Sequence, residues 1–81
     1  GATAQVQGII SHCEVMYRPR RSLVCRLQEN DVELTLRFLN FYPSQQKQLA
    51  VGKQIRVVGE VREGYFGLEM VHPKCRSVSD D

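Results

Sequence analysis

The sequence lacks long hydrophobic runs, and no stretch approaches the roughly 18 apolar residues of a membrane-spanning helix. It also shows no signal peptide, so we expect no membrane partner. Cysteine is scarce: Cys13, Cys25 and Cys75 form an odd set without the paired spacing of a zinc site. This argues against a secreted disulfide scaffold and predicts a reducing, cytoplasmic location. Gly1-Ala2 is compatible with a cloning remnant, in which case the chain is a piece of a longer protein.

Recognisable catalytic motifs are also absent. No nucleophile stands beside a base, and no glycine-rich phosphate loop carries a lysine, so the chain itself should not hydrolyse ATP. His72 and Cys75 have an H-x-x-C spacing, but a complete metal site would need two more ligands from His12, Cys13 and Cys25. We therefore predict no enzyme activity, no cofactor and no metal, with Cys13 and Cys25 as small core residues.

The chain has 81 residues, which is enough for one domain with a small core. Its hydrophobic content of 42% is ordinary for a globular protein, and its net charge of +2 alone indicates no partner. No repeat or low-complexity segment is present. We expect a domain over residues 4–76, with flexible termini at 1–3 and 77–81.

Apolar and polar residues alternate with a period of two in five segments, which predicts five half-buried strands. The segments are residues 5–17, 22–29, 32–39, 53–62 and 65–72. The first is not cleanly two-faced, because Ile9, Cys13, Val15 and Tyr17 share one face and Val6, Ile10, His12, Glu14 and Met16 the other. The residues predicted to face inward in the other four strands are Leu23, Cys25, Leu27, Val32, Leu34, Leu36, Phe38, Ile55, Val57, Val61, Phe66, Leu68 and Met70.

A short helix is predicted between the third and fourth strands. Pro43 suits its first position, Leu49 can plug a barrel end, and Gly52 is placed as its C-terminal cap. Pro73 is expected to end strand pairing. This order predicts an all-β fold, a five-stranded Greek-key OB-fold barrel with one short helix between strands 3 and 4. An SH3-like barrel is the main competitor, but it rarely has a helix at that position.

The densest positive charge is the loop Arg18-Pro19-Arg20-Arg21. Proline stiffens this loop, and the planar guanidinium groups suit bidentate contacts to phosphate. The loop can therefore clamp a DNA backbone, although a solvated loop with incidental charge gives the same pattern.

Apolar and aromatic residues gather where the third strand ends, at Leu39-Asn40-Phe41-Tyr42. Alternation places Phe38 in the core and Leu39 outside it. One of Phe41 and Tyr42 should pack on the helix, while the other faces solvent. An exposed ring can stack on a base, and an apolar side chain can wedge bases apart; alternatively, all of these residues cap the barrel.

Arg62 and Tyr65 flank the tight turn at Glu63-Gly64 and can extend the binding surface. A hairpin tip with one exposed tyrosine is, however, also common in proteins that bind nothing there. The complete set of predicted DNA-binding residues is Arg18, Arg20, Arg21, Arg37, Leu39, Asn40, Phe41, Tyr42, Arg62 and Tyr65.

These residues resemble the wedge domain of RecG-type ATP-dependent branched-DNA helicases over roughly residues 5–76. The matching segments are Arg20-Arg21, Leu36-Arg37-Phe38-Leu39-Asn40-Phe41, Leu49 with Gly52-Lys53, Val57 with Gly59 and Val61-Arg62, and residues 64–73. The resemblance implies an OB-fold inserted in a larger helicase of DNA repair and recombination. In that family the wedge splits strands at a stalled fork or Holliday junction, while separate motor domains, absent here, translocate on duplex.

Two positions depart from the family pattern. The family often has two consecutive phenylalanines before the asparagine, whereas this chain has Phe38-Leu39. Leucine can wedge but stacks poorly, so stacking can have moved to Phe41 or Tyr42, or strand separation can be weaker. The turn at residues 28–31 also lacks the usual glycine-rich spacing.

We predict a DNA-binding module that acts on branched or single-stranded DNA, with the helicase motor domains of a parent chain as partners. The alternative is a protein-interaction or architectural domain that uses the outward apolar residues Leu39, Val58 and Val71. A third reading is an RNA-binding OB-fold.

Overall fold

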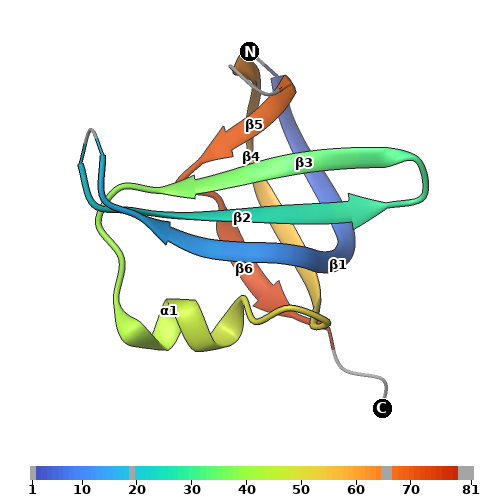
Figure 1. The fold of residues 1–81 in the computed structure, drawn as a ribbon. Coiled ribbons are helices and arrows are strands. Elements are labelled where there is room, and N and C mark those ends of the chain that lie inside the picture. The colour runs from blue at the N-terminus through green and yellow to red at the C-terminus, as the bar shows by residue number, and fades with distance from the viewer. Residues whose placement is uncertain (1, 19, 65–66, 79–81) are drawn as a thin grey trace.

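The computed structural model describes residues 2–18, 20–64 and 67–78, and it is built almost entirely of strands (Figure 1). The elements are β1 (Ala2–Met16), β2 (Ser22–Glu29), β3 (Val32–Phe38), α1 (Pro43–Gln48), β4 (Gln54–Gly64), β5 (Gly67–Val71) and β6 (Lys74–Ser77). The helix lies between β3 and β4, as predicted.

Five strands close into a ring. Their order is β1-β2-β3-β5-β4, and β4 pairs with β1 to complete the circle. β3 and β5 pair in parallel, and the other pairs are antiparallel. The predicted five-stranded OB-fold barrel is therefore confirmed. Each strand of the ring pairs with a neighbour on both sides over at least part of its length. This closure protects the sheet against edge-to-edge association.

The core fills the inside of this ring. Its buried members are Ile10, Leu23, Cys25, Leu27, Leu34, Leu36, Phe38, Phe41, Leu49, Ile55, Val57 and Met70. The inward faces predicted for β2 and β4 are correct, and Leu49 joins the core directly after α1 as expected. Two predicted inward residues near strand ends, Val32 and Leu68, are exposed instead, because the barrel does not cover those ends.

A β-bulge explains why the alternation of β1 is irregular. The pairing of β1 with β2 shifts register between Ile10 and His12. Ile10 points into the core before the bulge, whereas Cys13 and Val15 pack against the core after it. An extra residue in a strand reverses which positions face inward. The prediction that Ile9 shares a face with Cys13 and Val15 was therefore wrong, and its side chain is exposed.

The partner of β1 changes at Gly8-Ile9. Ile9 pairs with Gln54 of β4 on one side and with Gln28 of β2 on the other. A Cβ atom at Gly8 would collide with the backbone carbonyl of Gln28. Glycine is required here because two backbones approach each other closely.

The prediction that Pro73 ends strand pairing was wrong. His72 has a positive φ of 53°, which kinks the chain after β5. β6 then resumes pairing with β4, with Lys74 opposite Val58 and Arg76 opposite Arg56. A kinked strand therefore runs along β4 where the sequence predicted a single strand that stops.

Two further details differ from expectation. The helix ends at the C-cap Leu49, so Gly52 does not cap it; Gly52 instead takes a φ of 93° in the turn before β4. At the termini, Ala2 and Thr3 pair with β4, and so does Ser77. The flexibility expected for residues 1–3 and 77–81 stays a prediction, and residues 1 and 79–81 lie outside the described residues, as does Phe66.

Candidate nucleic-acid interface

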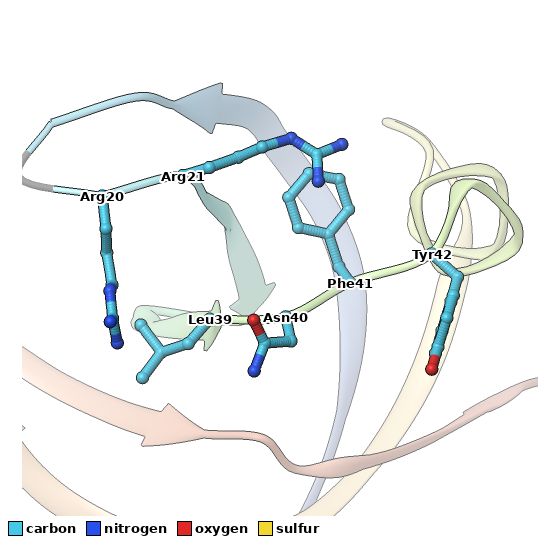
Figure 2. Close-up of a pocket in the computed structure, with 6 residues that line it drawn as sticks. All are labelled: Arg20, Arg21, Leu39, Asn40, Phe41 and Tyr42. Carbon is cyan, nitrogen blue, oxygen red and sulfur yellow. The ribbon is translucent and has the colours of Figure 1, made fainter.

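One surface hollow joins the basic loop to the end of β3. It has a volume of about 380 Å³, and we call its lining residues the rim: Arg20, Arg21, Leu39, Asn40, Phe41 and Tyr42. Two of them come from the β1–β2 loop and four from the connection between β3 and α1. Figure 2 shows the side chains of Arg20, Leu39, Asn40 and Tyr42 extending to the same side. Six of the ten predicted site residues therefore lie together.

Phe41 and Tyr42 have opposite environments. Phe41 is only 7% exposed and belongs to the core. The guanidinium carbon of Arg21 lies 4.2 Å from its ring centroid, so the ring's outer face is covered by a cation (Figure 2). Tyr42 is 72% exposed. Of the two aromatic candidates, Tyr42 is thus the ring that is open to a base.

The start of α1 fixes the backbone at Tyr42. Tyr42 is the N-cap residue with an extended backbone, and Pro43 occupies the first helical position. The Tyr42 N–H donates a hydrogen bond of 2.9 Å to Oε1 of Gln45. The Tyr42 side chain makes no cap hydrogen bond to the helix, so the exposed ring remains available for other contacts.

The kink at His72 fixes the other end of this connection. The backbone N–H of Leu39 donates to Nε2 of His72 at 3.2 Å, and the His72 N–H donates to the Arg37 carbonyl at 2.8 Å. The imidazole also meets the Phe38 ring edge-on, with centroids 6.1 Å apart. His72 therefore holds the Leu39 backbone in place. Sequence reasoning missed this role because it depends on the positive φ of His72, which no sequence motif predicts.

Arg37 and Arg62 lie outside the rim and share one carboxylate. Nε and Nη2 of Arg62 donate to Oε2 of Glu69 at 3.0 and 2.8 Å, and Nη2 of Arg37 lies 3.9 Å from Oε1. Glu69 is buried and was missed by sequence reasoning. The tight turn was predicted at Glu63-Gly64, but both residues belong to β4, and this longer strand places Arg62 opposite Glu69. Because both guanidinium groups are already paired with this carboxylate, Arg37 and Arg62 are less suited to bind phosphate than the rim arginines.

The remaining candidates are separate from the hollow. Arg18 is exposed in the same loop but does not line it. Tyr65 lies outside the described residues. Tyr17 was predicted to share a face with Cys13 and Val15, and it is 72% exposed beside the basic loop, where it offers a second aromatic ring. The exposure of Tyr17 could have been predicted from its position directly before Arg18 of the basic loop.

The three cysteines gather near the core. Cys13 and Cys25 are cross-strand partners with sulfurs 2.9 Å apart. Burial raises the pKa of Cys25 far above its ordinary value, and burial raises the pKa of Cys75 to about 11. Protonated thiols are poor nucleophiles and poor ligands, so Cys25 and Cys75 act as side chains that pack in and against the core.

Within residues 2–18, 20–64 and 67–78, no three histidine, cysteine or acidic side chains are grouped so that they could hold a metal ion. No helix in the described part of the chain is long and apolar enough to cross a membrane.

The alternative interaction patch has no exposed centre. Leu39, Val58 and Val71 are each half-buried. Leu39 follows β3, Val58 lies in β4 and Val71 lies in β5. These three half-buried side chains do not form a large exposed apolar patch of the kind that marks protein interfaces.

Comparisons with known proteins point to one group of enzymes. The chain is 34% identical over 80 residues to the ATP-dependent DNA helicase RecG of Escherichia coli K12, and 31% identical over 80 residues to RecG of Pasteurella multocida. Each alignment covers 99% of this chain, which spans 12% of the length of these relatives. No family model matches.

The fold agrees with this sequence likeness. A solved structure described as RecG bound to a three-way DNA junction matches 96% of the chain with a TM-score of 0.76, at 23% identity, over 11% of its own length. The resemblance to the RecG wedge domain predicted from the residues is therefore confirmed, and the OB-fold barrel is confirmed a second time.

Proposed function

We propose that this RecG-like domain binds branched or single-stranded DNA at replication forks and recombination junctions, with the rim as its contact surface. The observation that carries this proposal is the single hollow shared by Arg20, Arg21, Leu39 and Tyr42. A cationic edge beside the half-buried Leu39 and the exposed ring of Tyr42 suits a place where a duplex opens, because phosphates and unstacked bases are both present there.

Each part of the rim has a distinct role in this proposal. Arg20 contacts a phosphate, and Arg21 does so while its guanidinium rests on Phe41. Arg18, in the same loop but outside the rim, adds a further phosphate contact. Tyr42 stacks on an unpaired base, a contact worth about 1–3 kcal/mol. Leu39 wedges against the last base pair but stacks poorly. Tyr42 therefore replaces the aromatic ring that the family often places at the Leu39 position.

The parent protein, in this proposal, is an ATP-dependent DNA helicase of repair and recombination in the cytoplasm. Its relatives are named ATP-dependent DNA helicases, and this chain spans 12% of their length. Motor domains on the rest of the parent chain hydrolyse ATP and move along duplex, and the present domain positions the junction.

Binding to a fork, a duplex and a single strand of equal length tests the proposal. We expect the fork to bind most tightly, with affinity that falls steeply as salt is raised, because each phosphate contact releases counterions. The variant Arg18→Gln/Arg20→Gln/Arg21→Gln should lower the magnitude of the log–log salt slope by about 2–3. Tyr42→Ala should reduce the preference for the fork.

The matched control is Arg26→Gln/Lys47→Gln/Lys53→Gln, which removes the same charge away from the rim. It should change fork affinity much less than the loop triple Arg18→Gln/Arg20→Gln/Arg21→Gln. Equal affinity for all three DNAs, unchanged by the loop triple and by Tyr42→Ala, contradicts the proposed function. Tighter binding to RNA of the same sequence in direct competition also contradicts it.

A further inference from the structure

A second basic surface lies on strands that contribute nothing to the rim. Arg56 of β4 and Lys74 and Arg76 of β6 line a shallow hollow of about 270 Å³ together with Gln5 and Val58. We call these three cations the β4–β6 basic face. Figure 1 shows β4 and β6 side by side, and β6 is the strand that the sequence did not predict.

Strand register explains why the three cations gather. Arg76 lies directly opposite Arg56, and Lys74 lies opposite Val58. Positions two apart in a strand share a face, and Cys75 between them packs against the core. Lys74 and Arg76 must therefore point outward with Arg56, and all three residues are exposed.

The charge of this face is not compensated. Among residues 2–18, 20–64 and 67–78, none of the three cations makes an ion pair. The nearest outward acid along β4 is Glu60, two positions beyond Val58 and outside the hollow. Like charges directly opposite each other in a sheet are destabilising. An anion bound between Arg56 and Arg76 would neutralise both charges and remove this repulsion.

Arg56 is also held in a defined orientation. Its Nε and Nη2 atoms donate to Oε1 of Gln7 at 3.2 and 2.9 Å. Gln7 is its partner across β1 and β4. An arginine fixed by two of its nitrogens loses less side-chain freedom when Nη1 meets an anion.

The occupant follows from what surrounds the cations. None of the described residues that line the hollow is aromatic, so these residues offer no surface for stacking an unpaired base. A row of exposed cations without aromatic neighbours suits phosphates presented on the outside of a base-paired helix. We propose that the β4–β6 basic face binds the phosphate backbone of a DNA duplex, as a second DNA-binding site separate from the rim.

This inference goes beyond the proposed function and does not require the rim to bind bases. The rim would contact the branch point, and the β4–β6 basic face would contact one paired arm. The two sites share no lining residue, so they can be removed independently.

The test uses a blunt 20-base-pair duplex and the triple variant Arg56→Gln/Lys74→Gln/Arg76→Gln. We expect at least a tenfold loss of duplex affinity at 50 mM salt, and a fall of about 2–3 in the magnitude of the salt slope. The control Arg26→Gln/Lys47→Gln/Lys53→Gln loses the same charge elsewhere and should lose less than threefold. The melting temperature of the face variant should be unchanged or higher, because repulsion between Arg56 and Arg76 is removed.

Backbone-amide chemical shifts separate this site from the rim. Adding duplex to the wild type should shift amides of residues 5–7, 56–58 and 74–77. Equal losses in the face and control triples overturn the proposal, and so do shifts confined to the rim. Polyglutamate that displaces the duplex at equal charge concentration also overturns it, because the face would then prefer acidic protein. Failure of fork preference alone concerns the rim and leaves this result standing.

Discussion

Arg21 and Arg20 are neighbours in one loop, yet their side chains do different things. The Arg21 guanidinium lies over the buried Phe41 ring, whereas Arg20 extends beside Leu39 (Figure 2). Arginine covers apolar surface with part of its side chain while keeping its charge in water. Arg21 therefore stabilises the fold as well as offering charge, and Arg20 offers only charge.

Separate alanine substitutions distinguish these roles. Arg21→Ala should lower the free energy of unfolding by about 0.5–1 kcal/mol through the lost cation–π contact. Arg20→Ala should change it by less than about 0.5 kcal/mol, as expected for an exposed side chain. Urea unfolding of both variants measures the difference. Equal stabilities would contradict the assigned role of Arg21.

The thiols give a prediction about pH. The pKa of Cys75 is raised to about 11, from an ordinary 9.0, by burial. At pH 8 the thiolate fraction should therefore be about 100-fold lower than in the unfolded chain, since each pKa unit is a factor of ten. Alkylation of Cys75 by iodoacetamide, followed by mass spectrometry with and without urea, checks this. Comparable rates in both conditions would contradict it.

The same shift fixes the sign of a stability effect. The folded state holds the Cys75 proton more tightly than the unfolded state, so the contribution is fully present below about pH 9. It should be lost as the pH rises from about 9 to 11. Cys75→Ser should flatten that part of the curve of unfolding free energy against pH.

At the scale of elements, the sequence predicted the strands with simple alternation and missed those with a break. Leu23, Cys25 and Leu27 were placed correctly because β2 has no bulge. β1 has a bulge after Ile10, and no residue type marks it. β6 was missed because proline usually ends pairing, whereas here the left-handed backbone of His72 redirects the chain before Pro73.

Gly8 offers a test of the strand crossing. Gly8→Ala should destabilise the domain by about 1–3 kcal/mol, because the new methyl group would meet the immobile carbonyl of Gln28. Gln5→Ala, at an exposed position of the same strand, should cost less than about 0.5 kcal/mol. Thermal unfolding of the two variants compares them directly. A Gly8→Ala protein as stable as the Gln5→Ala control would mean that β1 and β2 can separate there.

At the scale of the whole molecule, a net charge of only +2 conceals two distinct basic surfaces. The loop arginines were predictable because they are adjacent in the sequence. The β4–β6 basic face was not, because its cations meet only through the pairing of a kinked strand. The sequence could not show whether Arg37 and Arg62 are available to DNA, because both pair with Glu69, whose burial is known only from the structure.

The proposed function depends on contact between the rim and the branch point of the DNA. Its most direct test is the ratio of fork to duplex affinity for the wild type and for Leu39→Ser/Tyr42→Ala, at one salt concentration. We expect the ratio to fall at least fivefold in the variant while duplex affinity stays within twofold, since a lost stacking contact is worth about 1–3 kcal/mol. An unchanged ratio in a folded variant would contradict the account.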